Sequence, residues 1–265
     1  METRSLFYFL MKKIQPKQFC DMGSLDGAES LLFRKVLINT NFYAFEANPE
    51  NFQFMVQNEM LKTKNINVYD FAVSDKSDKC SFFIADENSD PTSLGCYGNS
   101  SLLIPDIERI PTLRTVKEEV EVDAIRIDEF LLKKESIINA ALWIDVEGAA
   151  WQVLKGMENI KDDVCLINVE VEKEAKWKNQ KTLSDVQSLM NKFGFSEIAR
   201  KLPNGWRVGD FIFINDKYKK ELSKIDIIIC KLQAIIWFQL LIPIIRKLLP
   251  KKFYFIIKKK YMGWA

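Results

Sequence analysis

The sequence predicts an α/β fold, in which a mainly parallel β-sheet carries helices on both of its faces. Short apolar runs alternate with segments of helical periodicity along most of the chain. Strands joined through helices form right-handed units, and such units build parallel sheets that are covered on both sides. The chain has 265 residues, 48% of them hydrophobic, and can bury a full core as one large domain or as a domain with an appendage.

The first half of the chain supplies three strands and two helices of this pattern. Residues 5–11 are apolar and precede two lysines, so we expect a short helix packed on the body and not a signal peptide. A later helix begins at Asn48-Pro49, because asparagine caps a helix and proline suits its first turn. The predicted strands are 18–22, 42–46 and 66–73, and the predicted helices are 28–37 and 48–61.

The second half continues the alternation and closes with a pair of strands at 195–199 and 210–214. Residues 78–118 break the rhythm, and an insertion of this length often covers a ligand site. Within it, residues 92–101 are rich in hydroxyl and amide groups and form either a lid over a polyhydroxyl substrate or an ordinary surface loop. The other predicted strands are 119–122, 141–145 and 164–169, and the helices are 127–133, 149–155 and 183–193.

The composition excludes several kinds of chemistry. The chain has no histidine, which excludes Ser-His-Asp and Cys-His catalysis, histidine metal sites and imidazole pH switches. Proton transfer near neutral pH must therefore use Asp, Glu, Lys, Tyr or Cys. The five cysteines are scattered without a C-x-x-C spacing, which favours a reducing compartment.

Charge is divided unevenly along the chain. Residues 217–265 contain 12 Lys or Arg and 2 Asp or Glu, whereas residues 1–216 contain 26 basic and 34 acidic residues. We therefore predict an acidic domain over 1–216 and a basic tail over 217–265 that has a partner of its own.

The tail interleaves apolar and aromatic groups with lysines over residues 225–260. This pattern predicts amphipathic helices that lie on an anionic membrane surface. The longest run without charge, residues 232–245, has 14 residues and is too short to span a bilayer. A buried dimerisation element and an RNA-binding segment are the alternatives, and the high apolar content argues against nucleic acid.

Three carboxylates close predicted strands: Asp21, Glu46 and Asp145. Ligands of open parallel sheets bind beyond these strand ends. Gly23 and Gly27 flank the turn after the first strand, where glycine lets the backbone approach a ligand and a helix N-terminus offers N–H donors. Glu46, about 20 residues downstream, is placed to accept hydrogen bonds from a ribose diol. The pattern favours a nucleoside cofactor, with a plain strand–turn–helix corner as the alternative.

Several segments match a known pattern: Asp21-Met-Gly-Ser-Leu-Asp-Gly27, Ala44-Phe-Glu-Ala-Asn-Pro49, Asp70-Phe-Ala-Val-Ser-Asp75, and Ile144-Asp-Val-Glu-Gly148 with Val153-Leu-Lys-Gly156. Over roughly residues 15–215 the chain resembles the FkbM-type S-adenosylmethionine-dependent methyltransferases. Their pattern runs approximately as D-x-G-A-N-x-G, F-E-P-N-P, K-I-D-V-E-G and L-K-G. This sequence departs from it at Ser24-Leu25, where small residues and asparagine are usual, at Ala47 in place of proline, and at Trp143 in place of lysine.

The resemblance implies a class I methyltransferase fold, which is Rossmann-like, with a seven-stranded sheet whose last two strands form an antiparallel pair. It implies S-adenosyl-L-methionine as the cofactor. Asp21, Gly23 and Gly27 would surround the methionine part, Glu46 would hold the ribose hydroxyls, and the backbone near Phe71-Ala72 would meet the adenine. The cofactor-binding residues that it implies are Asp21, Gly23, Ser24, Asp26, Gly27, Glu46, Asn48, Asp70, Phe71 and Ala72.

Asp145 and Glu147 are the candidate catalytic residues. Methyl transfer to a hydroxyl needs in-line positioning and removal of the hydroxyl proton, which a carboxylate within hydrogen-bond reach can accept. Mg²⁺ held by the two carboxylates is a less favoured alternative, and we expect no metal. A structural alternative is that Asp145 caps the helix that starts near Gly148 while Glu147 orients a loop.

These features predict a cytoplasmic enzyme, held at the inner face of a membrane by its tail, that methylates a sugar hydroxyl in a glycan, polysaccharide or glycolipid. The acceptor could be a lipid-linked glycan, a homo-oligomer stays open, and no nucleic-acid partner is expected. One alternative is a nucleotide- or dinucleotide-binding α/β protein, against which the missing G-x-G-x-x-G counts. The other is a catalytically inactive, membrane-bound scaffold of the same fold.

Overall fold

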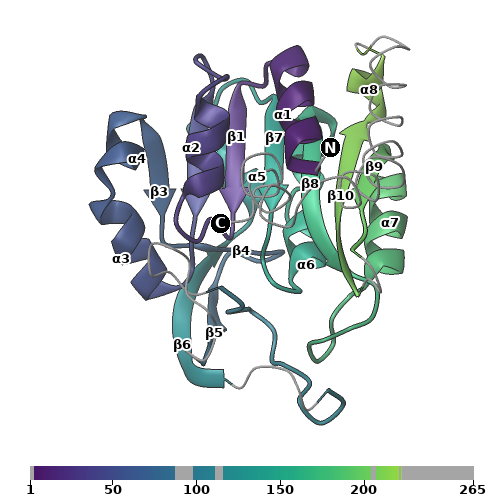
Figure 1. Cartoon of the computed structure of the whole chain (residues 1–265). Helices are drawn as coiled ribbons and strands as arrows, with labels where there is room; N and C mark the ends of the chain where they lie inside the picture. Colours follow the sequence, from purple (N-terminus) through teal and green to yellow (C-terminus); the bar gives the residue numbers. More distant parts are fainter. Residues whose placement is uncertain (1–2, 87–97, 111–115, 204–206, 221, 223–265) are drawn as a thin grey trace, which may run out of the picture.

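The computed structural model describes residues 3–86, 98–110, 116–203, 207–220 and 222. These residues contain a seven-stranded sheet in the order β3-β2-β1-β7-β8-β10-β9, in which only β10 runs antiparallel to its neighbours (Figure 1). The predicted mainly parallel sheet with an antiparallel closing pair is confirmed. Its strands are β1 (Gln18–Met22), β2 (Asn41–Phe45), β3 (Ile66–Tyr69), β7 (Ala140–Ile144), β8 (Val164–Glu172), β9 (Phe195–Lys201) and β10 (Val208–Asn215).

Helices cover both faces of this sheet, as predicted. One core, which contains Phe33 and Trp143, lies between the sheet and α1 (Thr3–Ile14), α2 (Ala28–Arg34), α3 (Pro49–Gln57) and α4 (Glu59–Thr63). The other, which contains Phe130, Leu142 and Val153, lies under α5 (Ile127–Lys134), α6 (Ala150–Lys155), the 3-10 helix η1 (Glu158–Asp163) and α7 (Leu183–Lys192). Successive side chains of a strand point to opposite faces, so each apolar strand supplies both cores.

The apolar N-terminal segment forms the predicted helix, α1, which packs on the body. Leu6, Phe7, Leu10 and Met11 recur at helical spacing and are buried. Phe7 meets the ring of Trp143 edge-on, with 5.3 Å between ring centroids. Trp143, which stands where FkbM-type sequences usually carry lysine, therefore lies under α1.

Three predicted elements differ in their extent. The helix predicted over 48–61 is two helices, because the extended backbone of Asn58 ends α3 and its side chain caps α4 through the Met60 N–H. The strand predicted over 66–73 stops at Tyr69, and after the exposed Asp70 the chain leaves the main sheet. The helix predicted over 28–37 is α2, which ends at Arg34.

The insertion contains a strand that we did not anticipate. β5 (Lys79–Ala85) pairs with β6 (Val116–Ile125), and β6 pairs with β4 (Ala72–Val73), so the described residues include a three-stranded sheet in the order β4-β6-β5. β6 extends well beyond the strand expected at 119–122, because β5 pairs along most of its length. This small sheet projects from the carboxyl edge of the main sheet, the lower edge in Figure 1.

The described part of the chain ends shortly after β10. α8 (Asp216–Lys219) follows β10, and Tyr218 and Leu222 are buried in the core beneath α1. The amphipathic helices predicted over 225–260 lie outside the described residues, as does the part of 92–101 before Gly98. Within the described ranges, no helix has both the length and the apolar character that crossing a membrane requires.

Candidate active site

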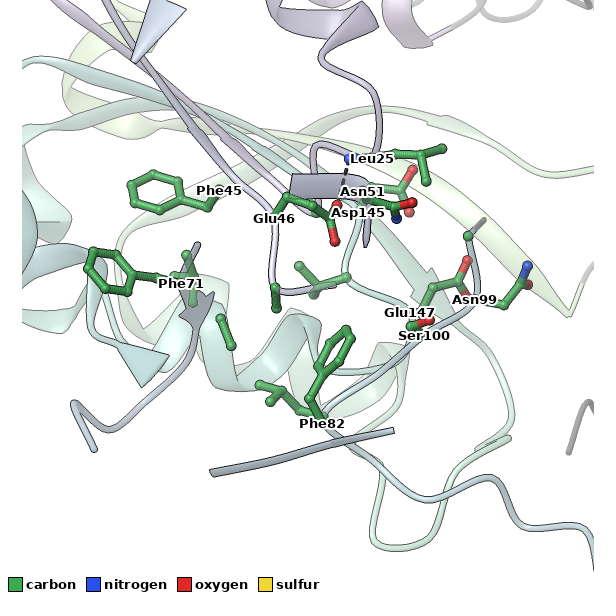
Figure 2. Close-up of a pocket in the computed structure, with 17 residues that line it drawn as sticks. Leu25, Phe45, Glu46, Asn51, Phe71, Phe82, Asn99, Ser100, Asp145 and Glu147 are labelled. Atoms are coloured by element: carbon green, nitrogen blue, oxygen red, sulfur yellow. Dashed lines mark hydrogen bonds between the residues drawn. The ribbon is translucent and has the colours of Figure 1, made fainter. Parts of the chain in front are cut away.

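A cavity lies at the carboxyl edge of β1, β2 and β7. The strand order reverses here, because the chain runs outward from β1 to β3 and returns to β7 on the other side of β1. Ligands of open parallel sheets bind at such a switch point. The lining residues come from these strand ends and from the insertion: Gly23, Leu25, Phe45, Glu46, Ala47, Asn51, Phe71, Ala72, Val73, Phe82, Gly98, Asn99, Ser100, Leu102, Asp145, Val146 and Glu147 (Figure 2).

Three residues other than glycine that line the cavity hold their backbone in the left-handed region. The φ angles are 57° at Leu25, 67° at Asn99 and 43° at Glu147. Such backbone is costly for residues other than glycine and clusters at functional sites. The strain at Glu147 is supported by the insertion, since the Ser101 hydroxyl donates a hydrogen bond of 2.6 Å to the Glu147 carbonyl.

Asp21, at the end of β1, organises the turn that forms one wall. Its Oδ2 accepts hydrogen bonds from the hydroxyls of Ser24 at 2.8 Å and Ser30 at 2.7 Å. Its Oδ1 is buried and has no hydrogen-bond partner among the described residues. Burial raises the pKa of Asp21 to about 6. The carboxyl group thus connects β1 to the first turn of α2 through one oxygen, while its other oxygen accepts no hydrogen bond from the described residues.

Gly23 brings this turn against the end of β7. Its φ is +76°, and a Cβ atom there would lie 1.9 Å from the carbonyl oxygen of Asp145, so no other residue fits. The N–H groups of Gly23 and Ser24 both donate to the carbonyl of Phe45, at 3.1 and 3.0 Å. The turn therefore locks the ends of β1, β2 and β7 together.

Glu46, directly after β2, is a buried carboxylate at the cavity. Its Oε2 accepts from the Leu25 N–H at 2.7 Å, its Oε1 from the Asn48 N–H at 2.8 Å, and the Asn51 side chain adds a further hydrogen bond. Despite these bonds, burial raises the pKa of Glu46 to about 7. A carboxylate offers about four acceptor positions, so Glu46 can still accept a hydrogen bond from a ligand hydroxyl.

The end of the cavity near β3 and β4 is apolar. Phe71 stacks on Tyr69 with 6.0 Å between centroids and 12° between planes, and Tyr69 stacks in turn on Phe45 at 5.6 Å. Ala72 lines the same end, and Phe82 of the insertion faces it (Figure 2). Small and aromatic side chains of this kind accommodate a flat heteroaromatic ring.

The opposite end is acidic. Asp145 and Glu147 follow β7, Glu170 lies beside Asp145 on β8, and Asp210 of β10 pairs with Glu170 in register. Carboxylate oxygens of Asp145, Glu147 and Glu170 lie within 4.8 Å of one another. Asp145 faces the open cavity, whereas Glu147 and Glu170 are half-buried. Burial among protein atoms and then the carboxylate of Glu147 raise the pKa of Asp145, and burial and Asp145 raise that of Glu170.

This acidic arrangement can do two things chemically. A carboxylate that faces the cavity and has a raised pKa can accept a proton from a neutral hydroxyl. Three carboxylate oxygens at this spacing also match the hard ligands that a divalent cation prefers.

The structure brings six of the sequence-predicted site residues together around the cavity: Gly23, Glu46, Phe71, Ala72, Asp145 and Glu147. Five others shape its frame without lining it: Asp21, Ser24, Asp26, Gly27 and Asn48. Asp26 accepts from the Ala28 N–H at 2.9 Å, and Asn48 caps α3 as predicted, accepting from the Glu50 N–H at 3.0 Å. Asp70 is exposed between β3 and β4 and does not line the cavity.

Sequence reasoning missed several lining residues. Asn51 lies three residues after the cap Asn48, so the helical period places both side chains on the same face of the helix, toward Glu46. Phe82 belongs to β5, whose β-prone residues were a signal that we did not use. Leu25 gave no signal, because leucine rarely adopts a left-handed backbone. Gly98, Asn99 and Ser100 lie in the segment that we considered a lid or a surface loop, and they line the cavity.

The sequence pattern of a family described as "Methyltransferase FkbM domain" matches residues 21–197. No curated protein matches the chain. Among solved structures, the chain is similar to the methyltransferase FkbM from Methylobacillus flagellatus KT, at 11% identity and a TM-score of 0.49 over 76% of this chain and 44% of that one. It thus spans less than half the length of that protein.

Two further solved structures are similar at the level of the fold. The O-methyltransferase from Bacillus cereus has 8% identity and a TM-score of 0.46, over 80% of each chain. The magnesium protoporphyrin IX methyltransferase from Synechocystis PCC 6803 has 7% identity and a TM-score of 0.44, over 79% of this chain and 75% of that one.

Proposed function

Because the chain belongs to the FkbM methyltransferase family, we propose that it methylates a hydroxyl oxygen of a sugar, with Asp145 as the general base. The chain has the class I methyltransferase fold, and S-adenosyl-L-methionine is its cofactor. The sugar acceptor and the transfer to oxygen are our inference. The observation that carries it is the carboxylate of Asp145, which faces the cavity and has a raised pKa. The chain has no histidine that could act as the base in its place.

The residues around the cavity fit S-adenosylmethionine. Glu46 has acceptor capacity left for ribose hydroxyls, the apolar end around Phe71 and Ala72 suits an adenine, and the acidic end suits a positively charged sulfur. Asp21 does not line the cavity, but it holds the turn that does, through the hydroxyls of Ser24 and Ser30. When bound, the cofactor supplies an electrophilic methyl group on that sulfur.

Asp145 would do the proton chemistry at the acidic end. Methyl transfer forms a C–O bond to the acceptor hydroxyl and breaks the C–S bond, and the hydroxyl proton must leave. A carboxylate whose pKa lies near the pH at which the enzyme works can accept that proton as the new bond forms. Burial, and then the negative charge of Glu147, raise the pKa of Asp145, which favours this role.

The insertion supports a polyhydroxyl acceptor. Asn99 and Ser100 reach the cavity beside Glu147, which adds an amide and a hydroxyl next to the acidic end (Figure 2). Side chains that both donate and accept hydrogen bonds suit sugar hydroxyls.

We also propose that the enzyme is cytoplasmic and associates peripherally with a membrane through residues 225–260. The support is the sequence alone, in which lysines alternate with apolar and aromatic residues. Replacing Lys258, Lys259 and Lys260 with glutamate would then weaken binding of the full chain to anionic vesicles.

The test of the reaction is Asp145→Asn. We expect kcat for methylation of a responsive sugar acceptor to fall by about 10²-fold or more, because the hydroxyl proton has no acceptor. S-adenosylhomocysteine should bind within a few-fold of the wild-type affinity. NAD and a nucleotide-sugar are the negative controls and should not bind. The exposed Asp123→Asn is the matched control. Unchanged turnover would remove Asp145 as the base.

A divalent cation at Asp145, Glu147 and Glu170 is the second candidate, supported by their mutual spacing. The two mechanisms separate in the presence of a chelator. A proton-accepting Asp145 predicts that EDTA leaves kcat unchanged and that activity rises with pH through the raised pKa of Asp145. Loss of activity in EDTA and its return with Mg²⁺ would support the cation.

A further inference from the structure

The edge of the sheet opposite the active site is strongly basic. At this edge the parallel strands begin, β10 ends, and α1, α2 and α4 reach their C-terminal ends, at the top of Figure 1. A lysine at a helix C-terminus complements the helix dipole, so each one alone needs no further explanation. The exposed lysines near this edge are Lys12, Lys13, Lys17, Lys35, Lys62, Lys64, Lys133, Lys134, Lys192, Lys217 and Lys220.

Large apolar side chains project from the same edge. Ile38, in the loop before β2, is 80% exposed, and Ile137, in the loop before β7, is 60% exposed. Leu132, in the last turn of α5, is 58% exposed. The helix dipole gives no reason for isoleucines to face water. Exposed apolar groups that gather within a charged surface mark an interaction site.

The loops that carry these side chains are bound to one another. Strand β1 lies between β2 and β7, and its first residues connect both loops. The Asn41 N–H donates to the Lys17 carbonyl at 2.8 Å, and the Lys17 N–H donates to the Asn139 carbonyl at 2.8 Å. The Gln18 side chain donates to the Ile137 carbonyl at 3.1 Å. Ile137, Lys17 and the loop with Ile38 therefore form one ordered platform.

Several acidic groups at this edge have partners, although Asp163, directly before β8, has none among the described residues. Glu59 pairs with Lys62 at 2.9 Å, Asp216 pairs with Lys219 at 3.8 Å, and Glu135 accepts from Asn41 and Tyr43. In contrast, its lysines include several that make no ion pair with any described residue, among them Lys12, Lys17, Lys35, Lys64 and Lys133. Exposed lysines therefore outnumber acidic groups at this edge.

We propose that this edge docks on an anionic lipid bilayer. We call it the amino edge and define it by Lys17, Lys35, Ile38, Lys133 and Ile137. Lysines near an anionic surface each strengthen binding about five-fold, and exposed isoleucines insert among the acyl chains. RNA would satisfy the lysines but leave the isoleucines in water, which is why the occupant is lipid. The inference depends neither on the acceptor nor on residues 225–260.

Docking in this way sets the orientation of the enzyme. The active site lies at the other end of the strands, and five residues at about 3.3 Å each separate the two edges by about 16 Å. The cavity then opens away from the bilayer. A membrane-linked acceptor would present a hydroxyl that stands well clear of the lipid surface, as in an extended glycan chain.

The test measures how much of the full chain sediments with vesicles, in about 0.1 M salt. One set of vesicles is pure phosphatidylcholine, and the other contains about 30% phosphatidylglycerol. The variant is Ile38→Asp with Ile137→Asp. The matched control is Ile104→Asp with Ile107→Asp, which are 45% and 46% exposed on the insertion at the other edge. We expect the first pair to lower partitioning onto anionic vesicles at least ten-fold, and the control to stay within two-fold of wild type.

A second variant, Lys17→Gln with Lys35→Gln, removes only exposed charge and should also weaken binding. All variants should keep the wild-type Tm and affinity for S-adenosylhomocysteine, which separates lost docking from lost folding and from failure of the proposed reaction. Unchanged partitioning of the Ile38 and Ile137 pair overturns the proposal. A greater loss of binding in the control pair also overturns it, because the opposite edge would then face the membrane. Wild-type binding that is equal with and without phosphatidylglycerol overturns it too.

Discussion

Single backbone positions decide the shape of the turn between β1 and α2. Gly23 and Leu25, two residues apart, both have a positive φ, but for different reasons. Gly23 is needed because the Asp145 carbonyl occupies the space of a side chain. Leu25 has room for its side chain at the cavity wall and bears only the intrinsic cost of left-handed backbone, of about 1–2 kcal/mol. Gly23 is therefore fixed by a long-range contact, whereas a different residue at position 25 could raise the stability of the fold.

We predict that Gly23→Ala destabilises the protein by about 3–5 kcal/mol, since the new Cβ would overlap a backbone oxygen that cannot move freely. Gly194→Ala is the control, because Gly194 has φ +80° and nothing within 4 Å of the added Cβ. Its cost should be only about 1–2 kcal/mol. Urea unfolding measures both, and similar values for the two variants would contradict the close approach at Gly23.

We predict that Leu25→Asn stabilises the protein by about 0.5–1 kcal/mol, because asparagine tolerates a left-handed backbone that leucine does not. For a chain of this size the change corresponds to a rise in Tm of about 2 °C. The Leu25 N–H that binds Glu46 is retained. A lower Tm, measured by thermal unfolding, would mean that the apolar contacts of Leu25 outweigh its strain.

At the scale of elements, α1 and β7 explain an apparent anomaly of the sequence. Trp143 lies against Phe7 of α1 and against Phe33 of α2, at 5.3 and 5.4 Å between centroids, and is 6% exposed. A lysine there, as is usual in the family, would have its ammonium group buried between helices. Trp143 thus belongs to the packing of α1 and not to the active site, while Asp145 turns into the cavity.

We predict that Trp143→Lys costs about 3–5 kcal/mol, because it removes a buried aromatic side chain and buries an unpaired charge. Trp143→Phe keeps the apolar contact and should cost about 1–2 kcal/mol. Chemical unfolding gives these values, and limited proteolysis within residues 3–14 reports release of α1. A small loss for Trp143→Lys would show that α1 moves aside without affecting the body.

At the scale of the whole molecule, buried carboxyl groups gather at the active-site edge. Burial is the main cause that raises the pKa of Asp21 to about 6 and those of Glu29, Glu46 and Glu172 to about 7. In the unfolded chain these groups titrate near 4. Between pH 4 and 7 the folded protein therefore holds protons that the unfolded chain has released.

This difference sets the sign of the pH dependence. The stabilisation is fully present below about pH 4 and is lost as pH rises through 6 to 7, at about 1.4 kcal/mol for each unit of pKa difference. We predict that the ligand-free protein has a lower Tm at pH 8 than at pH 5. Glu46→Gln should reduce this difference, by on the order of 2–3 kcal/mol, whereas the exposed Glu50→Gln should not. A Tm that rises steadily to pH 8 would contradict the prediction.

The sequence by itself determined the features that depend on local chemistry. Alternating strand and helix periods predicted the parallel sheet, Asn48-Pro49 predicted the start of α3, and the strand-end positions of Gly23 and Glu46 predicted the edge where the cavity lies. These succeed because each depends on side-chain period, capping or turn formation within a few residues.

Only the tertiary structure decided which residues share the site. Glu170 reaches Asp145 because β8 pairs with β7, Phe82 and Ser100 reach the cavity because the insertion folds back over it, and Asp70 lies outside because the chain leaves β3 there. The amino edge likewise joins lysines and isoleucines from loops far apart in sequence. Lateral strand pairing and the packing of the insertion depend on contacts between distant residues, which local periodicity does not encode.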